Sequence, residues 1–526
     1  MQKNEHNTYN TLFYWHNFRL RLVFEGVIVG LLTGLVIVLY RYLIEKAGEI
    51  TNMIYQAQLR NHFLIPLWLI ALVLIGYVIG TIVKKEPMVS GSGIPQVEGV
   101  LLRRLSMNWW RVIIGKFVGG VLAIGAGLSL GREGPSVQIG AAVGQGFCRV
   151  FKRIKLEEKF LITSGASAGL AAAFNAPLAG VIFSLEEIHK NFSPVVLTCV
   201  MAASLTADFV SKEFFGLKPV FDFSNIHPLP LDKYIYIIAL GIVVGAFGVL
   251  FSKILLKTQN LYARQIWLPV QLRPVIPLLL AGVLGLTLPQ VLGGGHGLIM
   301  SLVTGNFGLL VLIVLLFMKF AFTMVSYGSG APGGIFLPLL VIGAVTGDIY
   351  GSLLVNIFHF DAGYISNFII LAMAGYFTAI VKAPITGTIL ITEMTGSFNH
   401  LLALTIVSIT AYVVSDFLGS KPIYESMLER IIGNKSIEGF KGDDKTKVLI
   451  ESAVSMGSEA EGKLVKNLKW PEHCLLVGLK RGAREIIPRG GTTIYAGDYL
   501  IILANEDNAA EVREQISEMT EKCRFE

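Results

Sequence analysis

Charged residues are scarce in this sequence, and their scarcity argues against a soluble protein. Only 15% of the 526 residues are Asp, Glu, Lys or Arg, whereas soluble proteins carry about a quarter. Hydrophobic residues make up 53% of the chain, and its mean hydropathy is +0.62. Because no soluble core of this length could hide so much apolar surface, we expect a lipid bilayer to accept it.

Cysteine is also rare. The four cysteines are scattered, without a CxxC motif or another paired spacing: Cys148, Cys199, Cys474 and Cys523. This pattern argues against a metal cluster and against a disulfide framework. The formal net charge of +7 is modest, and no long basic tract alternates with aromatic residues. We therefore expect no nucleic-acid partner.

Patterns typical of enzymes are missing as well. The sequence has no P-loop and no HExxH pattern. Gly165-Ala-Ser-Ala-Gly169 matches the GxSxG pattern, but it lies in a stretch rich in Ala and Gly. A nucleophile elbow needs a strand before its sharp turn, together with acid and histidine partners. We interpret the match as chance, and we expect neither an enzyme nor a bound cofactor.

Long apolar stretches, in contrast, are abundant. They cover residues 20–43, 64–83, 112–130, 161–185, 194–210, 234–256, 275–292, 308–326, 337–357, 367–392 and 401–418. Several are too short to cross roughly 30 Å of hydrocarbon as one helix, or are interrupted by Gly or Pro. Broken helices are tolerated at membrane depth only where the backbone is buried in protein or lines a cavity. We therefore predict a multi-pass membrane protein with a transport pathway.

The cations near the first stretches indicate an orientation. Arg19 and Arg21 precede the first stretch, and Lys84 and Lys85 follow the second. Because positive residues concentrate on the cytoplasmic side, we expect a cytoplasmic N-terminus. The basic segment 149–159 fits either side. The first eighteen residues show no cleavable signal, so we expect the N-terminus to be retained.

Two parts of the apolar region echo each other. Asn175-Ala-Pro-Leu-Ala-Gly180 aligns with Lys382-Ala-Pro-Ile-Thr-Gly387, and the Gly-rich segment 131–144 resembles 334–347 at nearly the same offset. Paired segments interrupted by Gly or Pro indicate a transporter built from two repeats, with its site at their interface. An inverted repeat fits this pattern, although sequence likeness alone leaves the inversion open.

Three segments place Gly and Pro at the start of an apolar helical run. They are Gly91-Ser-Gly-Ile-Pro95, Gly131-Arg-Glu-Gly-Pro135 and Gly333-Gly-Ile-Phe-Leu-Pro338. Proline suits the first turn of a helix, and glycine lets the backbone approach an ion closely. Helix N-termini present unpaired N–H groups and partial positive charge. Three such ends that converge would bind an anion weakly enough to release it.

These motifs, in this order and spacing, resemble the signature of the CLC chloride channels and transporters. Residues 168–187, 328–334 and 419–424 are similar to that family as well, so the resemblance covers roughly residues 20–430. It implies an all-α polytopic membrane protein with two inverted repeats of tilted and broken helices. It also implies a homodimer in which each subunit has its own pore.

The resemblance further implies which groups bind chloride. The central chloride ligands would be the hydroxyls of Ser92 and Tyr424 and the backbone amides of Ile335 and Phe336. The amides of Gly93 and Ile94 would face an inner chloride. Serine at position 92 goes with a preference for chloride in this family.

Two acids complete the implied machinery. Glu133 matches the gating glutamate, and Glu187 matches the inner proton-transfer glutamate of the exchangers. An ionisable group at membrane depth is costly and is a functional candidate by default. A carboxylate beside helix N-termini is stabilised as an anion, yet it competes with chloride, and protonation frees the site. The plainer alternatives are a helix-dipole partner for Glu133 and a cytoplasmic helix end for Glu187.

Three residues depart from the family pattern or stand out in apolar surroundings. Gln96 follows the first motif where an acid is common, and Glu98 comes two residues later. Lys319 lies in an apolar stretch where similar proteins have arginine, and it would alter dimer packing, charge balance or pH response. Lys116 also lies in an apolar stretch, and we predict a charged partner for it.

The end of the chain has a different composition. Residues 1–432 form the predicted transmembrane domain, residues 433–447 read as a polar linker, and residues 448–526 read as a soluble α/β module. We expect strands at 474–479 and 499–503 and a final helix at about 509–522. The module resembles the RCK or TrkA C-terminal domain of potassium-transport regulators. This resemblance implies a cytoplasmic C-terminus and a small cytoplasmic ligand.

The sequence as a whole predicts a proton-coupled chloride antiporter in the plasma membrane, with chloride and protons as its cargo. One alternative has the same fold and is a passive, voltage-gated or pH-gated chloride channel. Another belongs to a different class and is a membrane receptor or sensor without ion flux. Glu187 favours the exchanger over the channel.

Overall fold

The computed structural model describes residues 5–153, 155–190, 194–221, 223, 226–265, 267–305, 307–433, 447–472, 474–482, 484–505 and 509–521. The chain forms two compact units, Met1–Lys435 and Ser436–Glu526. The predicted linker, 433–447, lies outside the described residues except for its first and last positions. Each unit is considered by itself.

The described part of the first unit is helical. Its first eight α-helices are α1 (Glu5–Arg60), α2 (Leu64–Lys85), α3 (Ile94–Leu101), α4 (Trp109–Gly125), α5 (Glu133–Val150), α6 (Lys155–Phe174), α7 (Pro177–Phe183) and α8 (Pro194–Phe215). The next eight are α9 (Tyr234–Arg264), α10 (Val275–Thr287), α11 (His296–Thr304), α12 (Leu309–Gly328), α13 (Phe336–Phe358), α14 (Ile365–Val381), α15 (Pro384–Thr395) and α16 (Leu401–Phe417). Helix α17 (Ile423–Gly433) follows them, and a π-helical segment, Ser184–His189, extends α7.

Apolar helices in this unit meet the length that a membrane crossing requires. Among the described residues, seven helical segments are long and apolar enough to cross a bilayer. Large apolar side chains on α1, α2 and α12, such as Leu39, Leu74 and Phe317, are exposed. Exposed leucine and phenylalanine in such numbers are stable against lipid tails and not against water. The first unit is therefore a multi-pass membrane domain.

Glycine faces allow the membrane helices to pack closely. The side of α1 that carries Gly26, Gly30 and Gly34 lies against the backbone of α8. A Cβ at Gly30 would lie 2.8 Å from the Cα of Ala203, which leaves no room for a larger residue. Small residues at helix interfaces in membranes permit this backbone approach.

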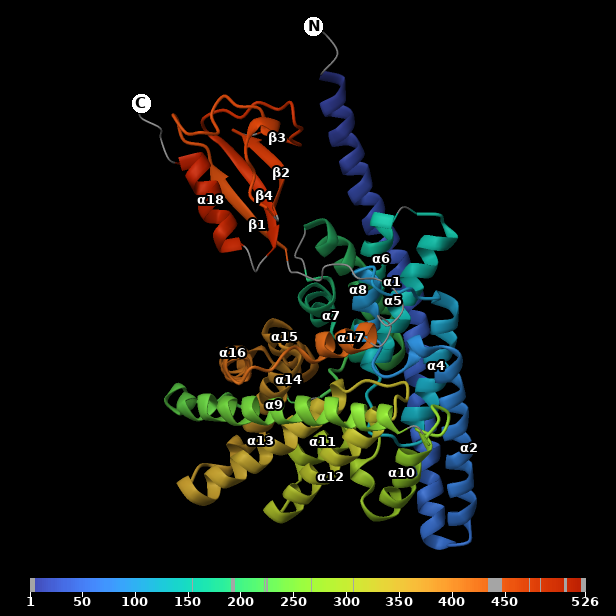
Figure 1. Cartoon of the computed structure of the whole chain (residues 1–526). Helices are drawn as coiled ribbons and strands as arrows, with labels where there is room; N and C mark the ends of the chain where they lie inside the picture. Colours follow the sequence, from blue (N-terminus) through green and yellow to red (C-terminus); the bar gives the residue numbers. More distant parts are fainter. Residues whose placement is uncertain are drawn as a thin grey trace. The chain divides into compact units, whose positions relative to one another are not determined.

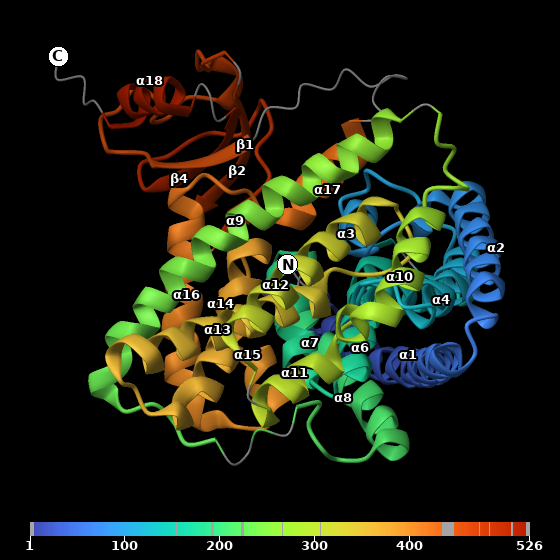
Figure 2. The same cartoon turned by 90° about the horizontal axis from the view of Figure 1, so that it is seen from below.

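Helices α1–α8 and α9–α16 form two structural repeats. Helix α1 packs on α8 and α6 in the first repeat, and α9 packs on α16 and α14 in the second. Likewise α5 packs on α6, and α13 packs on α14. The two repeats lie differently in space, because Figure 2 shows α1 nearly end-on and α9 along its length beside α16 and α14.

The contacts between the repeats are reciprocal. Glu186 accepts hydrogen bonds from the N–H groups of Ile385 and Thr386 at the start of α15, at 3.3 and 2.8 Å. Glu393, near the end of α15, accepts from Leu178 and Ala179 at the start of α7, at 3.1 and 2.7 Å. Each helix end thus caps the beginning of the equivalent helix, so α7 and α15 run in opposite directions. The two repeats are therefore inverted, as the sequence left open.

Helices α1 and α6 define the two sides of the domain. Arg21 of α1 and Glu157, near the start of α6, form an ion pair at 3.1 Å. Arg41 and Asn175, twenty residues later on α1 and just after α6, are hydrogen bonded at 3.1 Å. Twenty helical residues span about 30 Å, the thickness of the hydrocarbon core. We call these two ends the Arg21 side and the Arg41 side. Because Arg153 pairs with Glu25, the basic segment 149–159 lies on the Arg21 side.

The second unit is a small α/β module. Its strands β1 (Lys447–Ala453), β2 (Cys474–Arg481), β3 (Arg484–Ile486) and β4 (Asp498–Asn505) form an antiparallel sheet in the order β1-β4-β2-β3. Helix α18 (Ala509–Glu521) covers one face of this sheet, as Figure 1 shows, and packs on β1 and β4. The predicted strands at 474–479 and 499–503 and the final helix are confirmed, whereas β1 and β3 were not predicted.

Candidate functional site

Backbone hydrogen bonds tie together the loops that precede α3, α5 and α13. The Gly91 N–H donates to the Gly330 carbonyl at 3.3 Å, and the Gly333 N–H donates to the Gly91 carbonyl at 3.0 Å. Gly131 and Gly334 exchange two hydrogen bonds, each of 2.7 Å. The three Gly/Pro segments predicted from the sequence therefore lie together at the interface of the two repeats.

Each of these loops leads directly into a helix N-terminus. Helix α3 begins at Ile94 after Gly93, whose φ of +96° is a left-handed conformation that suits glycine. Helices α5 and α13 begin at Glu133 and Phe336, and prolines lie in the first turn of all three helices. The predicted helix starts are confirmed. Three sets of unpaired N–H groups thus point toward one region.

The Ser92 and Tyr424 hydroxyls lie in this region and are buried. The exposed fractions are 1% for Ser92 and 0% for Tyr424. Neither hydroxyl oxygen makes a hydrogen bond of full geometry among the described residues, and the Ser92 hydroxyl lies close enough to act on Tyr424. A buried hydroxyl without a partner costs about 1–3 kcal/mol, so both groups are suited to donate to an anion. A Cβ at Gly134 would lie 2.8 Å from the Ser92 carbonyl, which places the first turn of α5 against Ser92.

A cluster of phenylalanines fixes the start of α13. The Phe336 ring lies 4.5 Å from that of Phe377, 5.3 Å from that of Phe174 and 6.1 Å from that of Phe183, measured between centroids. Ile335 and Phe336 are fully buried. Packing of this kind holds the two backbone N–H groups in place without a charged side chain.

Glu133 is the first residue of α5 and is fully buried. Neither of its carboxylate oxygens makes a hydrogen bond of full geometry in the described part of the chain. The backbone N–H groups of Glu133 and Leu337 nevertheless lie close enough to act on the carboxylate as donors. The carboxylate therefore occupies the positive end of two helices, where an anion would also be stabilised.

Glu187 lies in the π-helical segment after α7, which packs on α3 and α6. It is 5% exposed, and one of its carboxylate oxygens has no partner among the described residues. His189 contacts Thr163 of α6 at 3.1 Å, which places the end of this segment toward the Arg21 side. The charges of Glu133 and Glu187 both act on Tyr424. Tyr424 is thus the residue that lies near both acids.

Comparisons with known proteins agree with this geometry. The family model described as voltage gated chloride channel matches residues 73–416. The chain belongs to the voltage gated chloride channel family. A second family model, the TrkA-C domain, matches residues 449–517. The helical domain and the α/β module thus match two different protein families, as the sequence predicted.

Two members of the family match this chain over most of their own length. The H(+)/Cl(−) exchange transporter ClcA of Salmonella schwarzengrund (strain CVM19633) is 35% identical over 438 residues, which covers 80% of this chain and 90% of that protein. The ClcA of Salmonella typhi is 35% identical over 437 residues with the same coverage.

Solved structures of the family share the fold. A slow cyanobacterial Cl−/H+ antiporter superposes with a TM-score of 0.76 at 29% identity, covering 79% of this chain and 99% of that one. A CLC-type fluoride/proton antiporter superposes with a TM-score of 0.63 at 25% identity, covering 75% and 95%.

Two buried lysines occupy equivalent places in the two repeats of this family member. Lys116 Nζ donates to the carbonyls of Val89 and Gly91, at 3.0 and 2.6 Å. Lys319 Nζ donates to the carbonyls of Val291 and Gly293, at 2.9 and 2.8 Å. The predicted charged partner of Lys116 is therefore wrong, because backbone carbonyls accept the hydrogen bonds of the ammonium group. Both lysines fix the loop before a short helix, and for Lys116 that loop carries Ser92.

Several polar residues near the site were not predicted from the sequence. Lys190 Nζ contacts Glu98 Oε1 at 2.7 Å and Glu425 Oε1 at 4.0 Å, so a cation ties the segment of Glu187 to α3 and α17. The charged residues at these helix ends could have indicated ion pairs. Their partners could not be predicted, because they are far away in sequence. Within the described residues, no group of three His, Cys, Asp or Glu side chains is arranged to hold a metal ion.

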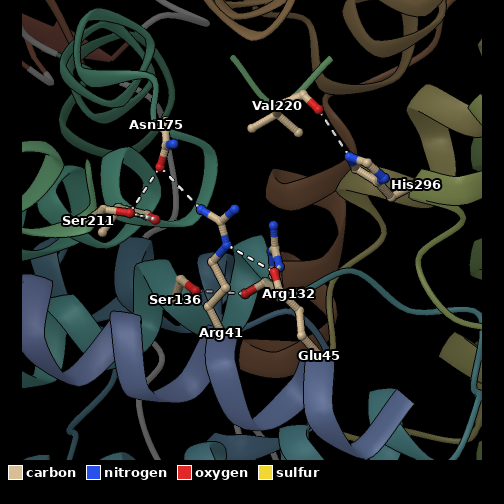
Figure 3. A network of polar contacts seen from close by, with 9 residues as sticks. Arg41, Glu45, Arg132, Ser136, Asn175, Ser211, Val220 and His296 are labelled. Carbon is tan, nitrogen blue, oxygen red and sulfur yellow. Dashed lines mark hydrogen bonds and ion pairs between the residues drawn. The ribbon is translucent and has the colours of Figure 1, made fainter. Parts of the chain in front are cut away.

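Arg41, Glu45 and Arg132 form a further unpredicted network on the Arg41 side (Figure 3). Arg41 and Glu45 come from α1, and Arg132 immediately precedes Glu133. The Glu45 Oε1 accepts from Arg41 Nε at 3.1 Å and from Arg132 Nη1 at 2.9 Å. Figure 3 shows Asn175 above the Arg41 guanidinium and His296 across from it, beside Val220.

Proposed function

We propose that this chain exchanges chloride for protons across a plasma membrane. One observation carries the proposal. Three helix N-termini, two unpartnered hydroxyls and one buried carboxylate meet at the interface of inverted repeats. Such a place binds an anion through dipoles and hydrogen bonds, and it holds one acid that can compete with that anion. The antiporters among its relatives support the same reading.

In this proposal, chloride is bound by neutral donors. The hydroxyls of Ser92 and Tyr424 and the amides of Ile335 and Phe336 hold the central ion, and the amides of Gly93 and Ile94 face an inner ion. Neutral donors give a weaker hold than a buried ammonium or guanidinium group would, which suits a transported ion. The burial of Ser92 and Tyr424 without partners supports their role as donors.

Glu133 acts as the gate. As an anion, its carboxylate takes the positive end of α5 and excludes chloride from that end. After it binds a proton, it no longer competes, and chloride enters. The ionised carboxylate and chloride therefore displace each other at the same positive field, and this competition couples the movement of protons to that of chloride.

Glu187 passes protons between Glu133 and the Arg21 side. Its burial and its lack of a partner for one oxygen support this role. The charges of both acids act on Tyr424, which supports a short separation between them. The Arg21 side is then cytoplasmic. This orientation agrees with the cations that precede the first apolar stretch and follow the second.

The chain also works as a homodimer with one pore per subunit, and its C-terminal module is cytoplasmic. We infer that this module binds a small cytoplasmic ligand and biases transport. The match to the TrkA-C domain supports the inference that the module binds a ligand. Deletion of residues 448–526 should leave the anion preference unchanged, and a changed preference would contradict this division of roles.

Reconstitution into liposomes tests the function. With an outward chloride gradient, the external pH should report protons driven uphill by chloride. Glu133→Gln and Glu187→Gln should lose proton movement while chloride still moves. Glu49→Gln is the matched control, because Glu49 is an exposed acid on α1 that pairs with Lys46. Chloride flux that never drives protons would indicate a channel, and no flux at all would indicate a receptor.

A further inference from the structure

The network on the Arg41 side contains more positive than negative charge. Two guanidinium groups, those of Arg41 and Arg132, share the single Glu45 carboxylate. The arginine side chains are only 12% and 13% exposed, whereas the Glu45 side chain is 42% exposed. The cations are therefore held in a region of low dielectric, while their counter-ion faces water. Arg132 also acts on the neighbouring Glu133 carboxylate, so the two arginines carry excess positive charge when Glu133 is protonated. A partly buried excess cation is costly unless it serves an anion.

Arg41 is held rigidly in this position. Its Nη1 donates to Asn175 Oδ1 at 3.1 Å, and Ser211 Oγ donates to the same oxygen at 2.9 Å. Its guanidinium carbon lies 3.8 Å from the centroid of the Phe215 ring. Glu45 of α1, Asn175 after α6 and Phe215 of α8 thus surround one guanidinium group, and Figure 3 shows its contacts with Glu45 and Asn175. A positioned guanidinium binds an anion with less loss of side-chain entropy than a flexible lysine does.

Arg132 connects this network to the gate. Its backbone leads directly into α5, and its carbonyl accepts a hydrogen bond from Ser136 Oγ at 2.9 Å within the first turn. Its Nε is buried and has no partner among the described residues. The guanidinium therefore lies next to Glu133 along the chain and keeps one donor free for an anion.

We propose that Arg41 and Arg132 form an entry site for small monovalent anions on the Arg41 side, with Glu45 as its competitor. The site precedes the gate and rests on the proposed function. An arriving chloride loses part of its hydration shell between the two guanidinium groups before it meets Glu133. Glu45 bridges the arginines and partly neutralises them, so the site concentrates chloride without trapping it.

The test is a series of charge changes on one helix. Arg41→Gln removes one positive charge, and Glu45→Gln removes the competing negative charge. The apparent KM for chloride should be measured in excised patches with the Arg41 side facing the bath. Arg41→Gln should raise this KM roughly two- to tenfold, and Glu45→Gln should lower it by a similar factor. Sodium gluconate added to raise the ionic strength should shrink both differences.

Lys46→Gln provides the matched control. Lys46 lies on the same helix, carries the same charge and pairs with the exposed Glu49 at 2.7 Å. Its replacement should leave the KM unchanged. Equal shifts in Lys46→Gln and Arg41→Gln, or shifts of the same sign in Arg41→Gln and Glu45→Gln, would overturn the proposal. Misfolding cannot mimic the lowered KM of Glu45→Gln.

The outcome separates this proposal from the proposed function. If chloride never drives protons in the unmodified protein, the exchange function fails, whatever the variants do. If exchange is intact and all three variants share the KM of the unmodified protein, only the entry site fails. Binding of chloride at the entry site would then have no part in transport.

Discussion

Gly131 leaves the space that the Glu133 carboxylate occupies. A Cβ at Gly131 would lie 3.2 Å from Glu133 Cδ, closer still to Oε2, and 3.1 Å from the Leu337 nitrogen. Contacts of this kind are tighter than normal packing permits, and the nearest atom is the end of a flexible side chain. We therefore expect Gly131→Ala to keep the fold and to push the carboxylate out of its place between α5 and α13.

The size of the effect follows from what the carboxylate loses. A hydrogen bond to a charged group contributes about 1.5–3 kcal/mol. If the carboxylate can no longer reach the N–H groups there, chloride gains that advantage, and its apparent affinity rises roughly ten- to hundredfold, since about 1.4 kcal/mol is a factor of ten. Gly131→Ala should therefore move chloride without proton coupling, as we also expect of Glu133→Gln.

This prediction can be tested in liposomes by recording chloride movement and pH at the same time. Gly48→Ala is the control, because a Cβ at Gly48 meets nothing within 4 Å. Coupling should be normal in the control and lost in Gly131→Ala. A Gly131→Ala protein that still couples protons to chloride as the unmodified protein does would refute the placement of the gating carboxylate.

Three further predictions concern stability. Gly30→Val places a side chain against the backbone of α8, so it should cost about 3 kcal/mol or more and lower the melting temperature in detergent. Glu393→Gln and Glu186→Gln remove equivalent helix caps, and each should cost about 1–2 kcal/mol by the same assay. Burial alone would raise the pKa of Asp498, but hydrogen bonds from Arg481 hold it below its ordinary value. The module should therefore lose stability as the pH falls below about 4. Hydrogen exchange of residues 447–505 in the full chain should show this acid step, and Asp498→Asn should lack it.

Contrary results are equally specific. A stable Gly30→Val protein would mean that α1 and α8 are farther apart than the structure has them. A cost for only one of the two glutamate caps would contradict the equivalence of the repeats. An acid step that persists in Asp498→Asn would assign it to another group.

The sequence predicted the parts of the site that depend on local chemistry. Gly and Pro set the starts of α3, α5 and α13 through φ angles and missing N–H groups, which are local properties. The apolar stretches and the change of composition after residue 432 predicted a membrane domain and a soluble module for the same reason. The roles of Ser92, Tyr424 and Glu187 remain predictions, because they depend on bound ions.

The sequence could not predict contacts between distant elements. Arg41 meets Arg132 through Glu45 only because α1 crosses the domain beside the start of α5. Lys116 was expected to have a charged partner, but backbone carbonyls, which no residue type reveals, take that place. Strand β1 was missed because its pairing with β4 joins segments about fifty residues apart, and strand pairing decides such short elements.

The most direct measurement of the central claim is chloride binding at two pH values. Isothermal titration of the purified protein should show tighter chloride binding at lower pH, because a protonated Glu133 no longer competes for the same place. The Glu133→Gln protein should bind chloride tightly with no dependence on pH. The same pH dependence in both proteins would show that the acid and the anion occupy different places, which would contradict the account.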